Sequence, residues 1–282
     1  MNPGPRSWLA ETHHANFELV RHFLARFFDS ELATAPGQWR KGAVGVVAGL
    51  LPAALLLYPM FVHRYGCVAI RQPSYACPAI ADYAAAYSRL VRTDTAWLIS
   101  LAICVTALVT ALLWQSLFPS RRDCLALAAL PVSQRQIFAA KFTALLAAFT
   151  VFVVALNLLP AALYAQVITS PWQTNSSVPL HAAATFAAMA CGCAFAFFSL
   201  LALQGVMLMI LPARLFARIA VVAQAVLFTL SVAALPFLWR EPPASAWWPP
   251  NWFLGLRDSA FRPALLALGL PAACALLAYL AS

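Results

Sequence analysis

Long apolar stretches constrain this chain more strongly than any other feature of its sequence. A helix of about 20 apolar residues crosses the roughly 30 Å of hydrocarbon in a bilayer. Six stretches reach this length, and they lie at residues 42–62, 96–117, 142–168, 181–211, 219–238 and 263–281. None alternates between apolar and polar residues as the strands of a membrane barrel do. The pattern therefore predicts an all-α integral membrane protein with six transmembrane helices.

The composition supports the same class. Hydrophobic residues make up 63% of the chain and charged residues 10%, whereas soluble proteins are about 45–50% apolar and about 25% charged. The formal charge of +9 comes from arginines and lysines in short segments beside the apolar stretches. Such charges are typical of cytoplasmic loops and of contact with anionic lipid headgroups. We therefore expect the positively charged residues to contact a lipid bilayer and not a nucleic acid.

The N-terminal region, residues 1–41, is expected to form a unit distinct from the transmembrane domain at residues 42–282. Its segment 17–28 is an amphipathic helix that is too short and too charged to span a membrane. It is predicted to lie in the membrane interface, to pack on a partner domain, or both. On its apolar face we expect Phe17, Val20, Phe23, Leu24, Phe27 and Phe28, and on its polar face Glu18, Arg21, His22 and Arg26.

The distribution of positive charge predicts the orientation in the membrane. Eleven of the 18 lysines and arginines lie in the N-terminal region, in the loop 118–141 and in the connection 212–218. The external loops are then 63–95, 169–180 and 239–262. The excess of positive charge on one side predicts that both termini and the loop 118–141 are cytoplasmic, in a cell membrane such as a bacterial inner membrane.

The loop 118–141 is the most strongly patterned connection in the chain. A charged turn is followed by a short apolar run, and Pro131 ends that run. Ser133 and Gln136 then have the spacing of a capping box, and Val132 and Ile137 have that of a hydrophobic staple. These signals predict a structured elbow from which a new helix starts.

The sequence contains few residues that could carry chemistry. It has no zinc-protease, nucleophile-elbow or phosphate-loop motif and no pair of carboxylates inside the expected spans, so we predict neither an enzyme nor a metal site. The central portions of the spans also lack the charged groups that ion-coupled carriers use. Polar residues that could line a transport path, or could instead form hydrogen bonds between helices, are Gln115, Asn157, Gln204 and Gln224.

Two of the seven cysteines share one external loop. Cys67 and Cys77 both lie between the first and second expected spans. If that loop faces an oxidising compartment, the two thiols are candidates for a disulfide, and otherwise they stay free.

Taken together, these features resemble the permease subunits of type-2 ABC exporters. Members of that family have six spans with both termini inside, an interfacial helix before the first span and a coupling helix between the second and third spans. The segment 249–256 resembles the external interfacial piece before the last span. The positions of the coupling loop that match the family pattern are Arg121, Arg122, Asp123, Leu130, Pro131, Ser133, Arg135 and Lys141.

The resemblance implies an ATP-driven exporter that moves a hydrophobic or amphiphilic substrate. It implies that a separate cytoplasmic ABC ATPase docks on the loop 118–141, and that a second permease copy or half completes a dimer. No cofactor is expected on this chain, because ATP and Mg would bind the partner. The external loop 63–95 is longer than in compact members, and the chain ends with its last span, which leaves open a fragment or half of a longer permease. The alternative is a membrane scaffold that holds a cytoplasmic partner without transport, followed by an unrecognised membrane enzyme or an ion-coupled carrier.

Overall fold

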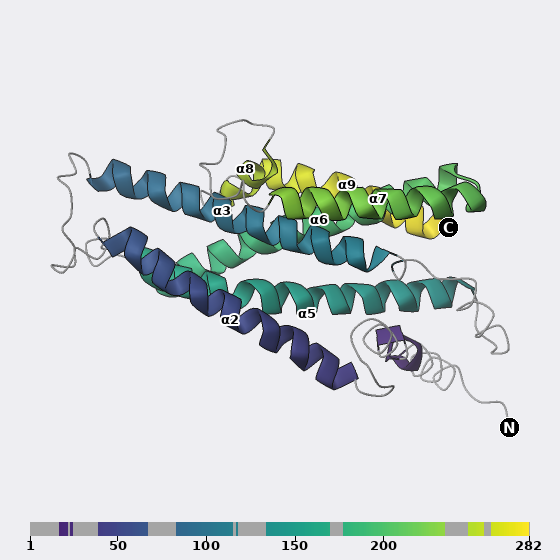
Figure 1. Ribbon diagram of the computed structural model, residues 1–282, viewed down its shortest axis with the longest axis horizontal. Helices are drawn as coiled ribbons and strands as arrows, with labels where there is room; N and C mark the ends of the chain where they lie inside the picture. The colour runs from purple at the N-terminus through teal and green to yellow at the C-terminus, as the bar shows by residue number, and fades with distance from the viewer. Residues whose placement is uncertain are drawn as a thin grey trace, which may run out of the picture. The chain divides into compact units, whose positions relative to one another are not determined.

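The described part of the chain is built from helices alone. The computed structural model describes residues 17–21, 23–24, 39–66, 83–114, 117, 134–169, 177–234, 248–256 and 261–281. Of these residues 94% are helical and none forms a strand. The principal helices (Figure 1) are α2 (Trp39–Tyr65), α3 (Tyr83–Leu112), α5 (Gln134–Ile168), α6 (Val178–Ile210), α7 (Ala213–Ala234), α8 (Pro249–Leu254) and α9 (Arg262–Ala281).

Four of these helices are long and apolar enough to cross a membrane. The spans lie within α3, α5, α6 and α9, at Ala84–Leu112, Gln136–Ile168, Val178–Ile210 and Arg262–Tyr279. A shorter apolar helix, Arg218–Ala234, lies within α7. The prediction of an all-α membrane protein is confirmed at this level.

Several helices start earlier than the apolar pattern predicts. The second span was expected from residue 96, with a short separate helix as one possibility near residues 79–91 of the loop 63–95. In the structure α3 is one helix that begins at Tyr83. Similarly, α7 begins at Ala213, and only Leu211 and Pro212 separate it from α6. Hydropathy marks where a helix enters hydrocarbon, whereas the helix itself can continue into the polar zone. In contrast, α5 begins at Gln134, the position that the capping box predicts.

The chain divides into two compact units. The first comprises Met1–Gly49 and Leu113–Phe152, and the second comprises Leu50–Leu112 and Val153–Ser282. In the first unit, residues 17–21 and 23–24 are helical. Leu19 and Phe23 are buried in one hydrophobic cluster with residues from the start of α5, namely Ile137, Ala140 and Ala144.

This cluster corrects the predicted face of the N-terminal helix. The expected face included Phe17 and omitted Leu19, but Leu19 is buried and Phe17 is 64% exposed. The side chains of Val20 and Leu24 are partly buried against the cluster. The Nζ of Lys141 lies 5.9 Å from the centroid of the Phe23 ring, within the range of a cation–π contact. The buried face is therefore centred on Leu19 and Phe23.

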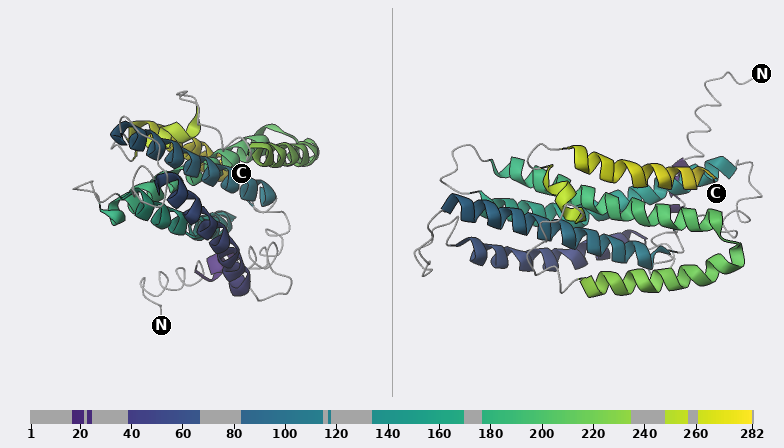
Figure 2. Two further views of the ribbon diagram at one scale, coloured as in Figure 1. Left: turned by 60° about the vertical axis from the view of Figure 1, so that its left-hand side comes forward. Right: turned by 90° about the horizontal axis from the view of Figure 1, so that it is seen from above.

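The second unit is organised around α6, which packs against α3 and α9 (Figure 2). The contact with α3 is close because Gly192 faces it. A Cβ added to Gly192 would lie 3.1 Å from side-chain atoms of both Ile99 and Ile103. Small residues permit such an approach between membrane helices. Elsewhere in the unit, α3 also packs against α7 and α8.

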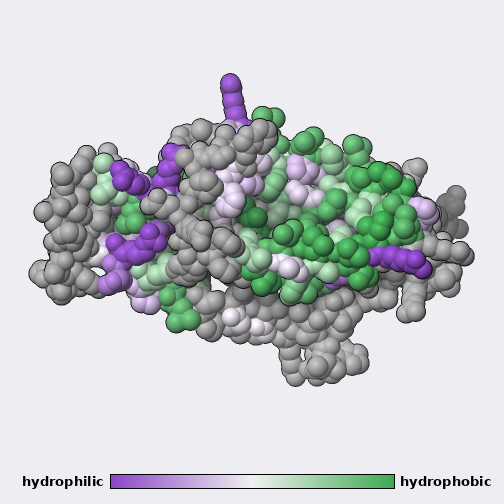
Figure 3. Space-filling model, turned by 45° about the horizontal axis from the view of Figure 1, so that its top comes forward, coloured by the Kyte–Doolittle hydropathy of each residue, from purple (hydrophilic) through white to green (hydrophobic). Residues whose placement is uncertain are grey.

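Large apolar side chains remain exposed on the outer helices. Figure 3 shows a broad hydrophobic area on the face that it displays, with hydrophilic residues gathered over the start of α3. A soluble monomer rarely exposes a contiguous apolar patch of more than a few hundred Å², so lipid contact explains this surface. The most exposed of these side chains on α7 and α9 are Val222, Leu230, Leu265, Leu266, Leu270 and Leu277.

Candidate functional site

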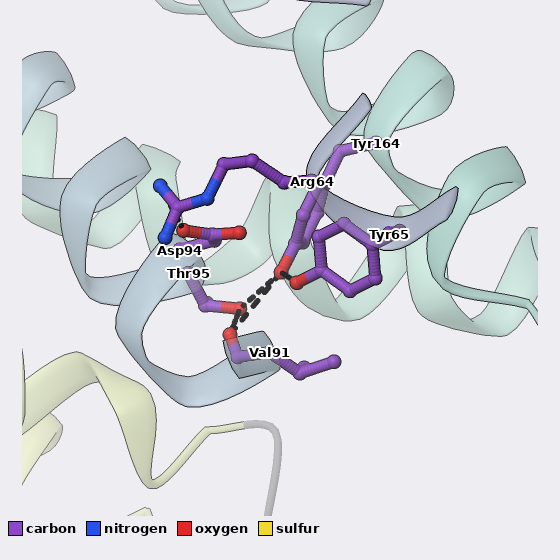
Figure 4. A network of polar contacts seen from close by, with 6 residues as sticks. All are labelled: Arg64, Tyr65, Val91, Asp94, Thr95 and Tyr164. Atoms are coloured by element: carbon purple, nitrogen blue, oxygen red, sulfur yellow. Dashed lines mark hydrogen bonds and ion pairs between the residues drawn. The ribbon is translucent and has the colours of Figure 1, made fainter. Parts of the chain in front are cut away.

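A polar cluster in the second unit is the most distinctive group of side chains in the described structure. It consists of Arg64 and Tyr65 at the end of α2, Asp94 and Thr95 in α3, and Tyr164 in α5 (Figure 4). Buried polar groups are expensive in an apolar protein unless they find partners. We refer to these five residues as the polar cluster.

The cluster contains an ion pair between α2 and α3. Arg64 Nη1 lies 2.9 Å from Asp94 Oδ1. The Asp94 side chain is 1% exposed, whereas that of Arg64 is 39% exposed. The carboxylate is therefore inside the protein, and the guanidinium that balances its charge remains in contact with the surroundings.

Three hydroxyl groups continue the cluster from α2 to α5. The hydroxyls of Tyr65 and Tyr164 lie 3.0 Å apart, and Tyr164 donates to the carbonyl of Val91 at 3.1 Å. Thr95 donates to the same Val91 carbonyl at 2.7 Å, and its oxygen lies 3.4 Å from that of Tyr164. The cluster thus joins three helices through side-chain contacts.

Aromatic rings surround these polar groups. The Phe61 ring lies 4.9 Å from that of Tyr164 and 6.1 Å from that of Trp97, measured between centroids. The Tyr65 ring lies 6.5 Å from that of Tyr87, whose hydroxyl donates to the carbonyl of Ile168. These ring contacts restrict the orientation of the two cluster tyrosines.

The arrangement is suited to holding helices together rather than to chemical catalysis. Its hydroxyls are engaged with one another or with backbone carbonyls, and its carboxylate is engaged with a guanidinium. In the described ranges, no three His, Cys, Asp or Glu residues are placed to hold a metal ion. Separation of α2 from α3 would break the ion pair, and we therefore call the cluster the polar lock between the end of α2, α3 and the last turns of α5.

The predicted path residues do not form one group. Asn157 is fully buried, and its amide donates to the carbonyl of Val153 and to the Cys193 sulfur, at 2.9 and 3.3 Å. Gln204 is also buried, but it lies eleven residues beyond Cys193 on α6, which is about 16 Å along a helix. Gln224 lies half-buried on α7. Asn157 thus makes the interhelical contact that was the alternative to a path role.

Most residues of the predicted coupling loop lie outside the described residues. This applies to Arg121, Arg122, Asp123, Leu130, Pro131 and Ser133, and also to Gln115, Cys67 and Cys77. Arg135 lies in the first turn of α5. The coupling role of the loop and the disulfide therefore stay predictions.

Sequence reasoning missed the polar cluster. Asp94 and Arg64 were counted only as loop charges, because they flank the apolar stretches rather than interrupt them. The two residues carry opposite charges and lie near the two ends of one loop, and this pattern could have indicated an ion pair. A tyrosine near the end of each of two spans, Tyr65 and Tyr164, was a further indication.

Comparison with known proteins does not assign the chain to a family. No protein-family model, no curated protein and no solved structure matches it.

Proposed function

We propose that this chain is the membrane-spanning permease subunit of an ATP-driven ABC exporter. In this proposal α2, α3, α5, α6, α7 and α9 are the six spans, and α8 is an external interfacial piece. Both termini and the loop 118–141 face the cytoplasm of a bacterial-type inner membrane. A separate ATPase binds ATP and Mg, a second permease copy completes the complex, and the substrate is hydrophobic or amphiphilic.

The observation that carries the proposal is the continuity of α5. This helix begins at Gln134, so it includes the last part of the predicted loop 118–141, and it ends at Ile168 with Pro160 inside it. Its 35 residues correspond to about 52 Å at 1.5 Å per residue. Tyr164 and the carbonyl of Ile168, which accepts a hydrogen bond from Tyr87, lie in its last turns. The helix that contains the end of the proposed docking loop therefore also carries Tyr164 of the polar lock.

Packing at the start of α5 supports the same function. The apolar face of the N-terminal helix is buried against Ile137, Ala140 and Ala144, which lie in the first turns of α5. A partner that moves the loop must move a stiff base if the motion is to reach the membrane. The cluster around Leu19 and Phe23 stiffens this base.

The composition of the polar lock suits a contact that opens and closes. Arg64 is 39% exposed, so water can replace its contact with Asp94 when the helices separate. Hydroxyl pairs such as that of Tyr65 and Tyr164 exchange protein partners for water at a net cost of about 0.5–1.5 kcal/mol per hydrogen bond. A purely apolar contact at this position would have no comparable alternative partners.

The test is a search of the neighbouring reading frames for an ABC ATPase, followed by its co-purification with this chain. The absence of such an ATPase would favour the scaffold. Wild-type protein is expected to bind that ATPase and to stimulate its ATP hydrolysis in proteoliposomes. Replacing Arg121, Arg122 and Arg135 with Glu is expected to abolish the stimulation, because the reversed charges repel acidic groups on the partner. Membrane insertion should be unchanged. Binding without stimulation by wild-type protein would instead indicate a scaffold, and full stimulation by the triple variant would contradict the coupling role.

A further inference from the structure

A cavity between α3 and α8 lies outside the polar lock and has no role in the proposed function. Its volume is about 740 Å³, within the 300–1,000 Å³ typical of small-ligand sites. The residues that give it its chemical character are Ser88, Arg89 and Arg92 on α3 and Asn251 and Leu254 on α8. Both helices belong to the second unit and pack against each other.

The lining of this cavity is cationic. Arg89 and Arg92 are three residues apart on α3, so their side chains project from neighbouring positions on one side of the helix. None of the described residues that line the cavity is acidic. In the part of the chain that the structure describes, neither guanidinium has a carboxylate within 4 Å, in contrast to Arg64, which is paired with Asp94. Two like charges so close together are unfavourable without an anion between them.

The remaining walls combine hydrogen-bonding and apolar groups. Ser88 donates to the carbonyl of Ala85 at 3.0 Å, which leaves its oxygen able to accept, and the amide of Asn251 borders the cavity. The side chains of Val91 and Leu254, both buried, supply apolar surface. An occupant that matches this lining has an anionic head and an apolar portion.

The α8 wall of the cavity is held in place by aromatic contacts. The Phe195 ring of α6 lies 5.6 Å from that of Trp252 and 5.9 Å from that of Phe253, and Phe253 is fully buried. A preformed wall reduces the cost of ordering the site when a ligand binds.

The position of the two arginines along α3 points to the headgroup zone. The helix has 30 residues, or about 45 Å, against about 30 Å of hydrocarbon. Its charged residues all precede Thr95, and residues 95–112 contain none. With residues 95–112 in hydrocarbon, Arg89 and Arg92 lie at the level of lipid phosphates.

From these observations we propose that the cavity between α3 and α8 binds the phosphate of an anionic amphiphile, with Arg89 and Arg92 as its ligands. Guanidinium groups bind phosphate oxygens through paired, charge-assisted hydrogen bonds, which an ammonium group cannot reproduce. The apolar wall formed by Val91 and Leu254 receives the start of the acyl portion. The proposal does not depend on whether the chain is a transporter.

The experiment is a lipid titration of the full-length protein in neutral detergent, followed by native mass spectrometry. The probes are phosphatidylglycerol, phosphatidylcholine with the same acyl chains, and inorganic phosphate. Wild-type protein is expected to bind phosphatidylglycerol at least tenfold more tightly than the Arg89→Ala/Arg92→Ala variant. This factor corresponds to the loss of at least one charge-assisted hydrogen bond. The matched control is Arg218→Ala, since Arg218 is an exposed arginine on α7, away from the cavity lining, and it should bind as wild type does.

Each arm of this experiment has a defined meaning. The Arg89→Lys/Arg92→Lys variant keeps the charge but should still bind less tightly, which separates a built phosphate site from general attraction. Competition by millimolar inorganic phosphate would show that the phosphate group alone suffices, whereas its failure would show that the acyl portion is needed. Equal affinity of wild-type protein and the double alanine variant for phosphatidylglycerol would overturn the proposal, as would equal loss in the Arg218→Ala control.

Discussion

Removing Arg64 from the polar lock gives the clearest test of how the described structure is stabilised. In Arg64→Met the side chain keeps much of its length but loses its charge, so Asp94 remains buried without a counter-charge. The Asp94 side chain is only 1% exposed and lies 2.9 Å from the guanidinium. The variant is therefore expected to be less stable than the wild type.

The magnitude follows from the burial of the two partners. Removing one partner of a fully buried ion pair costs about 3–5 kcal/mol. Because the Arg64 side chain is 39% exposed, water screens part of the interaction, and we expect about 1–3 kcal/mol. For a chain of this size about 1 kcal/mol lowers the midpoint of thermal unfolding by roughly 2–4 °C. The expected decrease is thus about 2–12 °C.

The assay is thermal unfolding of the detergent-solubilised protein, followed by size-exclusion chromatography after heating. Asp94→Asn and the double variant complete a thermodynamic cycle, and Arg218→Met serves as the control for loss of an unpaired arginine. The double variant should be nearly as stable as Asp94→Asn, because without the buried charge Arg64 has little left to neutralise. If the two single effects simply add, within about 0.5 kcal/mol, the ion pair does not contribute as described.

Three further predictions concern packing. Tyr164→Phe removes the hydroxyl that links α5 to α2 and α3, and it should lower stability by about 1–2 kcal/mol in the same unfolding assay. An unchanged midpoint would exclude a structural role for that link. Gly192→Val should cost about 1–3 kcal/mol by crowding α3, whereas Gly49→Ala, which meets no atom within 4 Å, should leave stability unchanged or slightly raised. Phe23→Ala removes about 1.5–3 kcal/mol of the free energy gained by burying the side chain, so it should speed amide hydrogen exchange in residues 17–24. Equal exchange rates in the variant and the wild type would show that other contacts hold the N-terminal helix.

The helical membrane fold was predictable because it depends on properties that single residues carry. The apolar stretches predicted both ends of α6 and α9 and the last residue of α5 to within a few residues. The capping box predicted the start of α5 at Gln134. The start of α3 at Tyr83 was not predictable in the same way. Its first turns contain Arg89, Arg92 and Asp94, and a helix of this composition outside hydrocarbon has no hydropathy signal.

The polar lock and the cationic cavity were not predictable for a different reason. Each depends on the placement of residues that are far apart in sequence, such as Arg64 and Asp94 in one ion pair, or Arg92 and Asn251 in the lining of one cavity. The sequence shows these residues singly, and singly each has the ordinary features of a residue near the membrane surface. The exposed position of Phe17 has a related origin. The period of 3.6 residues limits the apolar face, but the surface available on α5 decides which part of that face is buried.

The central claim is the proposal that α5 couples the loop to the membrane. Its most direct test is the ATP hydrolysis rate of an ABC ATPase reconstituted with this chain. Val154 and Leu158 are 39% and 56% exposed on α5, so both can be replaced with little loss of packing. Glycine at both positions softens the helix by about 1 kcal/mol each relative to alanine. The account predicts that the wild type and the double alanine variant stimulate hydrolysis equally and that the double glycine variant loses most of the stimulation. Full stimulation by the glycine variant, or an ATPase rate that does not change when this chain is added, would contradict it.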